Sequence, residues 1–112
     1  MQDCVFCKIV AGEIPSKFVD ETEHSVAFYD ISPRQPIHVL VVPKKHHTDV
    51  AQLSAADPAA LVDLIKLGSK IASEKSTGSF RLTFNTGAEA GQTVFHAHGH
   101  ITSTTPKEPL GK

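Results

Sequence analysis

The chain has 112 residues, of which 40% are hydrophobic and 21% are charged, a composition typical of one globular domain and not of a disordered or membrane protein. Its 11 Lys and Arg residues and 12 Asp and Glu residues give a formal charge of −1. A nucleic acid polymer usually requires a strongly basic surface, so any nucleotide ligand of this chain is expected to be small.

The N-terminal residues carry no secretory leader pattern, and no stretch of the sequence is apolar over the length that a membrane span requires. We therefore expect a cytoplasmic protein that binds neither a membrane nor a nucleic acid polymer. The expected organisation is a single domain over residues 1–112.

Local patterns predict a short helix and three strands in the first half of the chain. Residues 6–11 form the apolar run of a short helix that Gly12 ends. Residues 17–20 and 25–29 are predicted strands, and the second is the more apolar of the two. Residues 38–42 are almost all β-branched or apolar, which is typical of a central strand buried on both faces.

A longer helix is predicted in the second half. It begins near Ser54 or Asp57, either of which can cap it, and Gly78 ends the helical pattern. An apolar stripe at helical spacing is expected to pack against the sheet, and it consists of Leu61, Leu64, Ile65, Gly68 and Ile71 or Ala72.

Two further strands are predicted near the end of the chain. Residues 80–84 alternate in polarity, and residues 85–92 form a glycine-bearing hairpin loop that leads into a strand over residues 91–100. This order favours an α+β domain in which a five-stranded antiparallel sheet carries one long and one short helix on one side. The tail, residues 102–112, has little to bury and is expected to be extended or mobile.

Three histidines alternate with small residues in the predicted last strand. On a strand, His96, His98 and His100 would line one face at intervals of roughly 6.5–7 Å. No packing argument favours three imidazoles in a row, and a group that titrates near neutrality suits proton transfer, nucleophilic attack or metal binding. An isolated histidine such as His24 is interpreted instead as an ordinary core or surface residue.

The middle histidine, His98, is the predicted nucleophile. A histidine attacks phosphorus when an acceptor holds a proton on one ring nitrogen and leaves the other nitrogen free. A phosphoryl transition state also requires donors, and those nearby in the sequence are the side chains of Asn85, Gln92, Thr93 and His100 and the backbone N–H groups around Gly91. Gln92 and Thr93 could equally serve only to complete the hairpin.

A metal site is predicted from a second set of residues. Cys4 and Cys7 supply two thiolates, and a tetrahedral structural zinc needs two more ligands, for which His46 and His96 are candidates. A pair of reduced thiols without a metal is the alternative. A redox role is disfavoured because the sequence lacks the βαβ unit in which such Cys-x-x-Cys pairs occur.

From Cys4 to His100 the chain resembles the histidine triad (HIT) proteins, most closely their nucleotide-binding, purine phosphoramidase-like branch. Four blocks carry the resemblance, in order and in spacing: Phe6-Cys7-Lys8-Ile9-Val10 followed by Glu13-Ile14-Pro15; Ala27-Phe28-Tyr29-Asp30-Ile31-Ser32-Pro33; His38-Val39-Leu40-Val41-Val42-Pro43-Lys44-Lys45-His46; and Gly91-Gln92-Thr93-Val94-Phe95-His96-Ala97-His98-Gly99-His100. The resemblance implies a homodimer whose two sheets join edge to edge, each protomer binding one nucleoside monophosphate.

The resemblance also implies a role for each matching residue. His98 would form a nucleotidyl-histidine intermediate that water hydrolyses, while His38 and His96 support and orient it. The α-phosphate would be held by His100, Asn85, Gln92 and Thr93, the ribose hydroxyls by Asp30, and the base by Phe6, Ile9, Phe28 and Ile31. Zinc-carrying bacterial members of the family have their ligands where this chain has Cys4, Cys7, His46 and His96, with His47 as a competitor for the third position.

Two positions depart from the family pattern. Gly99 stands where the family prefers a bulky apolar residue, and residues 101–105 replace a glycine-rich turn. The missing side chain is expected to loosen the strand by about 0.5–1 kcal/mol and to affect the placement of His100.

The predicted function is hydrolysis or transfer on purine nucleoside monophosphate derivatives, with cleavage of a P–N bond that releases an amine. A dinucleoside polyphosphate hydrolase is an alternative within the same chemistry. Two interpretations from other classes remain open: a nucleotide-binding interaction protein with vestigial activity, and a zinc site formed by the three histidines themselves.

Overall fold

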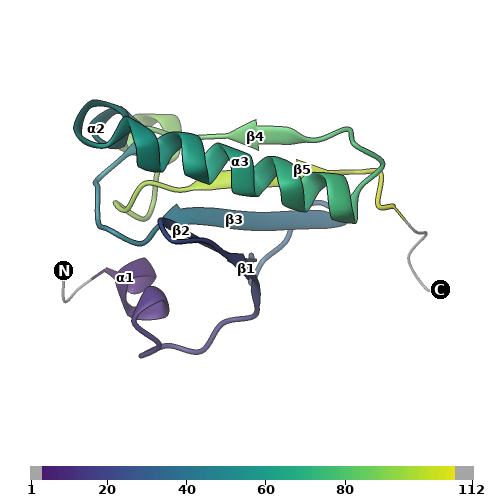
Figure 1. The fold of residues 1–112 in the computed structure, drawn as a ribbon, viewed down its shortest axis with the longest axis horizontal. Coiled ribbons are helices and arrows are strands. Elements are labelled where there is room, and N and C mark those ends of the chain that lie inside the picture. Colours follow the sequence, from purple (N-terminus) through teal and green to yellow (C-terminus); the bar gives the residue numbers. More distant parts are fainter. Residues whose placement is uncertain (1–3, 108–112) are drawn as a thin grey trace.

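The computed structural model describes residues 4–107 and contains one five-stranded antiparallel sheet (Figure 1). The strand order is β1-β2-β3-β5-β4, and the strands are β1 (Phe18–Glu21), β2 (Ser25–Tyr29), β3 (Ile37–Pro43), β4 (Arg81–Thr83) and β5 (Gly99–Ser103). Each neighbouring pair in that order is antiparallel. The predicted α+β fold with a five-stranded antiparallel sheet is therefore confirmed.

Strand β3 lies at the centre of the sheet, and all 7 of its residues are buried, as the sequence predicts. Because side chains alternate between the two faces, Val39 and Val41 join one apolar cluster, and Leu40 and Val42 join another. The same alternation places His38 on the face of Leu40 and Val42. The sheet therefore carries an apolar cluster on each face.

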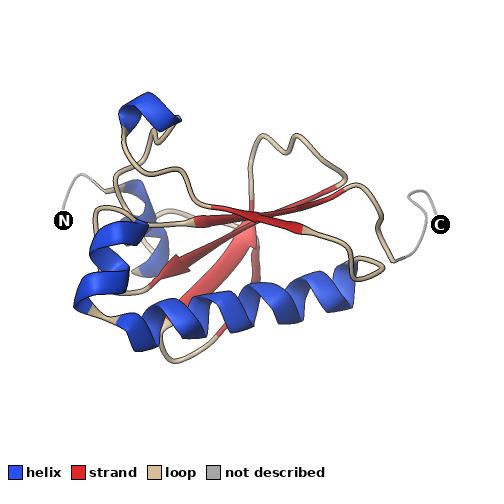
Figure 2. Cartoon of the chain, turned by 90° about the horizontal axis from the view of Figure 1, so that it is seen from above, coloured by secondary structure: helices blue, strands red, loops and turns tan. Residues whose placement is uncertain are grey.

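Helix α3 (Pro58–Lys75) covers one face of the sheet, as Figure 2 shows, and its buried residues join the cluster that contains Val39 and Val41. It begins at the second of the two predicted caps, because the Asp57 carboxylate accepts a hydrogen bond from the Ala60 amide at 3.1 Å. Ile65, predicted for the buried face, is instead 39% exposed, because it lies at the margin of a stripe that Leu67 completes. That stripe consists of Ala60, Leu64, Leu67, Gly68, Ile71 and Ala72.

Helix α1 (Val5–Val10) packs on the opposite face, where its buried residues Phe6 and Ile9 join the cluster that contains Leu40 and Val42. The expectation of helices on one side only is therefore wrong, since alternation along β2 and β3 makes both faces of these strands apolar. The cluster beneath α1 includes no residue of β4 or β5. Side chains of these two strands on the α1 face remain available for a site.

Helix α2 (Val50–Ala56) is not expected from the sequence patterns. The Asp49 carboxylate caps it by accepting a hydrogen bond from the Gln52 amide at 2.8 Å, and the helix ends directly before Asp57. Ser54, the other predicted cap, therefore lies inside α2. The helix buries only Leu53, so it lacks the apolar periodicity by which a helix is recognised in a sequence.

The backbone of the histidine run differs from the prediction. Strand β5 begins at Gly99, so His96 and His98 precede it, and the prediction of one strand through all three histidines is wrong. Strand β4 is only 3 residues long, and its pairing with β5 ends at Thr83 and His100, so it does not pair with the residues that precede β5. A loop holds the preceding segment instead, since the Ala97 amide donates to the His47 carbonyl at 2.7 Å.

The predicted tail begins later than expected. Thr102 and Ser103 belong to β5, and Ser76 forms an isolated bridge with Pro106. Residues 108–112 of that tail lie outside the described residues, and the single-domain organisation stays a prediction. Within residues 4–107, no helix combines the length and the apolar character needed to cross a membrane.

Candidate active site and metal centre

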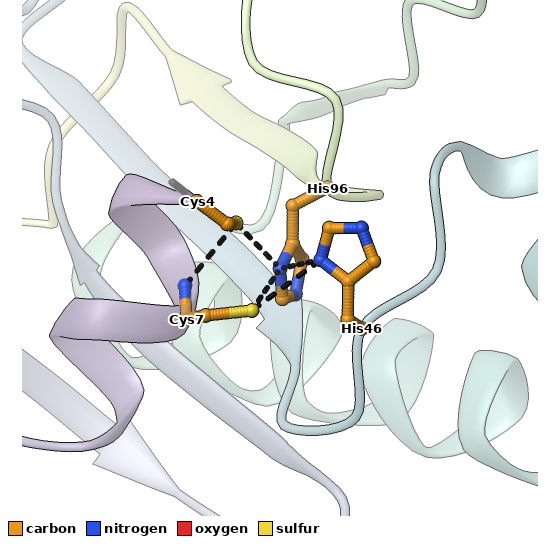
Figure 3. A group of neighbouring side chains, drawn as sticks. All are labelled: Cys4, Cys7, His46 and His96. Atoms are coloured by element: carbon orange, nitrogen blue, oxygen red, sulfur yellow. Dashed lines mark hydrogen bonds between the residues drawn. The ribbon is translucent and has the colours of Figure 1, made fainter. Parts of the chain in front are cut away.

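Four side chains from three parts of the chain converge beside α1 (Figure 3), and we call them the thiol cluster: Cys4, Cys7, His46 and His96. Cys4 Sγ lies 3.2 Å from His96 Nδ1. Cys7 Sγ lies 3.3 Å from His46 Nδ1 and 3.5 Å from His96 Nδ1, and 3.2 Å separates the two Nδ1 atoms. The structure thus brings together all four predicted metal ligands, with their ligand atoms within 4.8 Å of one another.

This geometry fits a metal ion. Around a tetrahedral zinc with two sulfur and two nitrogen ligands, neighbouring ligand atoms lie about 3.3–3.8 Å apart. His96 Nε2 lies 2.8 Å from the Pro43 carbonyl oxygen, and since a carbonyl only accepts, Nε2 carries the proton and Nδ1 turns a lone pair to the cluster. Burial lowers the pKa of His96 to about 4, which keeps the ring neutral and able to bind a metal.

His46, and not its neighbour His47, occupies the third ligand position. His47 is buried, and its Nε2 has no hydrogen-bond partner among the described residues. Its backbone carbonyl holds the Ala97 amide, directly beside His96. The two adjacent histidines therefore have different surroundings, which their order in the sequence does not reveal.

His98 has the geometry of a nucleophile. Its Nδ1 lies 2.7 Å from the His96 carbonyl oxygen, so Nδ1 carries the proton and Nε2 keeps a free lone pair. His98 is 8% exposed, and its imidazole packs against the Phe6 ring in a T-shaped arrangement. Burial lowers the pKa of His98, although the His96 carbonyl and the Asp30 carboxylate oppose this effect, so the neutral ring is favoured.

Asp30, His38 and His100 form a second group, which we call the histidine network. The Arg34 backbone amide donates to His38 Nδ1 at 3.2 Å, so the proton of neutral His38 is on Nε2. That Nε2 lies 3.1 Å from His100 Nδ1 and 3.4 Å from Asp30 Oδ2. His100 thus accepts on Nδ1 and carries its own proton on Nε2, and burial, the largest cause, lowers its pKa to about 4.

A polar pocket of about 420 Å³ opens beside the histidine network. The predicted phosphate-binding residues that line it are Asn85, Gly91, Thr93, His98 and His100, and Asp30 and His38 line it as well. Arg34 and Arg81, which the sequence patterns did not single out, belong to the same lining. The pocket therefore combines an unprotonated imidazole nitrogen with several neutral donors and two cations.

Gln92 is the predicted phosphate-binding residue that does not line this pocket. Its side chain is 3% exposed. Its Oε1 accepts from the Gly87 amide at 2.8 Å, and its Nε2 donates to the carbonyls of Thr48 at 2.7 Å and Val94 at 3.0 Å. These hydrogen bonds agree with the alternative, in which Gln92 completes the loop, and its contact with phosphate stays a prediction.

The four residues expected to hold the base do not line one common cavity. Phe6, Ile9 and Phe28 are buried together beneath α1. Ile31 is 96% exposed and lines a neighbouring cavity of about 710 Å³, which shares Asp30 with the polar pocket. Asp30 therefore stands at the junction of an apolar cavity and a polar one.

Packing explains the glycine at position 99. A Cβ atom at Gly99 would lie 2.7 Å from Leu82 Cδ1 and 3.2 Å from two ring atoms of Phe84. Both of these side chains pack against the cluster beneath α3, so the space is already filled. The predicted loss of packing at Gly99 is therefore wrong, because the side chains of Leu82 and Phe84 fill the space that a side chain at position 99 would occupy.

Sequence reasoning missed the two arginines, although one signal could have found Arg81. Positions 81 and 83 alternate with Leu82 along a predicted strand, so Arg81 and Thr83 share the face opposite to the core side chain. No local pattern identifies the backbone groups that orient the rings, since His96 and the Pro43 carbonyl are 53 residues apart.

The chain is similar to known proteins over most of its length. The family model of the HIT domain matches residues 11–107. An uncharacterised HIT-like protein of Synechocystis sp. is 44% identical over 109 residues, an alignment that covers 94% of this chain and 93% of the relative.

Solved structures share the fold. A HIT family hydrolase from Clostridium thermocellum has a TM-score of 0.88 at 37% identity, and the match covers 100% of this chain and 99% of that chain. A hypothetical histidine triad nucleotide-binding protein from Sulfolobus tokodaii has a TM-score of 0.79 at 34% identity, covering 95% of this chain and 71% of that chain. The sequence motif, the fold and these matches together show that the chain belongs to the HIT family.

Proposed function

We propose that the protein is a cytoplasmic nucleotide-binding hydrolase or transferase that cleaves purine nucleoside phosphoramidates, or related nucleoside monophosphate conjugates, through a nucleotidyl intermediate on His98. The observation that carries this proposal is the 2.7 Å contact between His98 Nδ1 and the His96 carbonyl, which leaves Nε2 unprotonated in the polar pocket. Two solved relatives are named as a hydrolase and as a nucleotide-binding protein, which supports it.

The proposed reaction has two displacement steps. First, His98 Nε2 attacks the α-phosphorus, a P–N bond to the imidazole forms, and the P–N bond to the leaving amine breaks as that amine takes up a proton from water. Water then attacks the same phosphorus, the bond to His98 breaks, and a nucleoside monophosphate leaves. The proton that the attacking water releases neutralises the hydroxide formed in the first step. The histidine returns to its neutral form.

Neutral donors of the polar pocket would stabilise the phosphoryl oxygens. The histidine network leaves the Nε2 proton of His100 free to donate. Asn85 and Thr93 add side-chain donors. Gly91 has a φ of 95°, a left-handed conformation that favours glycine, so its backbone turns beside Asn85 without a side chain in the way.

The nucleoside is assigned to the apolar side of Asp30. Asp30 Oδ1 accepts the Ser32 amide at 2.7 Å, and the carboxylate keeps further lone pairs with which to accept the ribose hydroxyls. The exposed Ile31 would contact the base, whereas Phe6, Ile9 and Phe28 are buried beneath α1 and do not line the apolar cavity. An almost fully exposed aliphatic side chain beside a cavity is a surface that a planar apolar ligand can cover.

Zinc is the metal proposed for the thiol cluster. Two thiolates and two imidazoles form a closed structural site, which would stabilise the fold and would leave no position open for catalysis. Both cysteines are free thiols, the form that a reducing cytoplasm maintains. By holding His96, zinc would also fix the carbonyl that orients His98.

We propose a homodimer in which two sheets join edge to edge. In the single chain the described sheet ends in β1 and β4, each of which has one unpaired edge able to accept a second copy. Sedimentation equilibrium should give twice the 12.0 kDa mass of one chain. A monomer at micromolar concentration would contradict this assembly.

The decisive experiment is mass spectrometry of the intact protein after brief incubation with a panel of adenosine and guanosine phosphoramidates. We expect a nucleotidyl adduct that maps to His98, and a loss of kcat of at least about a thousandfold in His98→Ala. His24→Ala removes an exposed histidine and should leave both the nucleotidyl adduct and kcat unchanged. Cleavage by His98→Ala at the wild-type rate would refute the mechanism, and tight AMP binding without turnover would favour a binding protein.

A further inference from the structure

Both arginines of the chain line the polar pocket, whereas no lysine within residues 4–107 does. Among residues 4–107, neither guanidinium lies within 4.0 Å of a carboxylate. Asp30 is the acidic residue of the described lining, and its two oxygens already face the Ser32 amide and His38 Nε2. Arg34 and Arg81 therefore give the pocket positive charge that no described carboxylate contacts.

The register of the sheet fixes the position of Arg81. His38 pairs with Thr102, and Thr102 pairs with Arg81, so the three residues form one row across β3, β5 and β4. His100 and Thr83 belong to the next row. Directly paired residues point to the same face, so Arg81 lies on the face of His38 and His100, about 10 Å from His38 along the row.

Arg34 approaches the same pocket from the loop that precedes β3. Its backbone amide donates to His38 Nδ1 at 3.2 Å, which ties the residue to the histidine network. Burial is the largest cause that lowers the pKa of His100 to about 4, and the charge of Arg34 acts in the same direction. The Arg34 guanidinium therefore lies within electrostatic range of the phosphate-binding ring.

Arg81 lies on the far side of the position assigned to the α-phosphate. The apolar cavity assigned to the nucleoside is lined by Tyr29 of β2 and His38 of β3, whereas Arg81 belongs to β4, and β5 with His100 lies between β3 and β4. Arg34 lines the polar pocket and not that apolar cavity. Neutral donors already surround His98, so the α-phosphate does not require the cations. The group attached to the α-phosphate opposite the nucleoside is the part of a substrate that would reach Arg81.

We propose that Arg34 and Arg81 form a subsite for a negatively charged leaving group, an inference that rests on the proposed function. The preferred substrates would then carry a carboxylate or a phosphate on the group joined to the α-phosphate. A guanidinium binds either anion through two parallel N–H donors, which a lysine ammonium cannot do. A conjugate of an acidic amine and a dinucleoside polyphosphate share this chemistry.

The test compares kcat/KM for substrates of matched size and different charge: the adenosine phosphoramidates of glutamate and of glutamine amide, with diadenosine triphosphate as the phosphate-bearing substrate. We expect the wild-type protein to prefer the glutamate conjugate over the neutral one by at least about tenfold. In the double variant Arg34→Gln/Arg81→Gln this ratio should fall toward one. A larger loss with diadenosine triphosphate than with the glutamate conjugate would identify phosphate as the preferred anion.

Lys66→Gln is the matched control, because it removes one positive charge from an exposed position of α3, outside the pocket. It should change neither the activity nor the ratio. A ratio that stays at its wild-type value in the double variant, or a wild-type ratio near one, overturns the subsite. If wild-type His98 still forms the nucleotidyl adduct in that case, the proposed function stands, whereas absence of the adduct with every conjugate overturns both.

Discussion

The thiol cluster and the histidine network each gather metal-type ligand atoms within 4.8 Å, yet their histidines are oriented in opposite ways. In the thiol cluster, His96 donates its Nε2 proton outward to the Pro43 carbonyl and turns an unprotonated Nδ1 inward. In the histidine network, His38 accepts the Arg34 amide on Nδ1 and turns its Nε2 proton inward. The first arrangement offers a lone pair to a cation, and the second offers a proton to His100.

Residue type and proximity alone therefore do not identify a metal site. The backbone group on the outer ring nitrogen decides which tautomer the imidazole adopts, and the tautomer decides whether the inner nitrogen binds a metal or donates a hydrogen bond. For His38 to bind a metal through Nε2, its Nδ1 would need a proton that the Arg34 amide opposes. We therefore expect the metal in the thiol cluster alone.

The largest effect should come from Cys7→Ser. Loss of one thiolate is expected to abolish stoichiometric zinc, with a fall in affinity greater than the roughly 10–100-fold that loss of an outer partner costs. Metal analysis of the purified protein measures this. Asp30→Asn, which alters the histidine network, should keep one zinc per chain. Zinc retained after both Cys4→Ser and Cys7→Ser would instead point to a site formed by the three histidines.

A smaller effect, on catalysis and not on metal content, is expected for His38→Ala. Without the His38 proton donor, His100 loses its fixed tautomer and orientation, and kcat/KM should fall on the order of a hundredfold. His38→Gln should recover part of the loss, because its amide can still donate to His100. Steady-state kinetics and metal analysis of the same samples test this, and loss of zinc from His38→Ala would contradict the separation of the two clusters.

Gly99 lies between the two histidines that face the pocket, and its replacement tests the packing behind them. Gly99→Leu would place atoms against Leu82 and Phe84 and should destabilise the fold by about 1–3 kcal/mol in urea unfolding. The double variant Gly99→Leu/Leu82→Ala should recover much of that loss, because it clears the nearest contact. Unchanged stability in Gly99→Leu would show that β4 does not fill this space.

The most gradual expected effect is the pH dependence of stability that arises from His100. Its pKa is about 4 in the folded protein and about 6.5 when unfolded, so the unfolded chain binds more protons between these values. The free energy of unfolding should therefore decrease as pH falls from 6.5 to 4, and His100→Asn should reduce that slope by up to about 1.4 kcal/mol per pH unit. The exposed His24→Asn variant should keep the wild-type slope.

Much of the fold and part of the site follow from local patterns in the sequence. The apolar runs predicted β2 and the buried centre β3, and Asp57 was one of two predicted caps for the helix that became α3. The Cys-x-x-Cys pair predicted two members of the thiol cluster, and His46 and His96 were candidates for the other two, with His47 as a competitor. These features are readable because alternation, helical periodicity and capping depend on neighbouring residues only.

Patterns in the amino-acid sequence were enough to predict the α+β architecture, the candidate ligands of the thiol cluster and His98 as the candidate nucleophile. The three-dimensional arrangement was needed to assign the proton on each ring, because the partners that fix it are backbone groups such as the Pro43 carbonyl, 53 residues from His96. It also decided that Arg81 faces the pocket, since pairing of β4 with β5 sets that position. Hydrogen bonds and strand register join distant segments, and no local pattern of side chains encodes them.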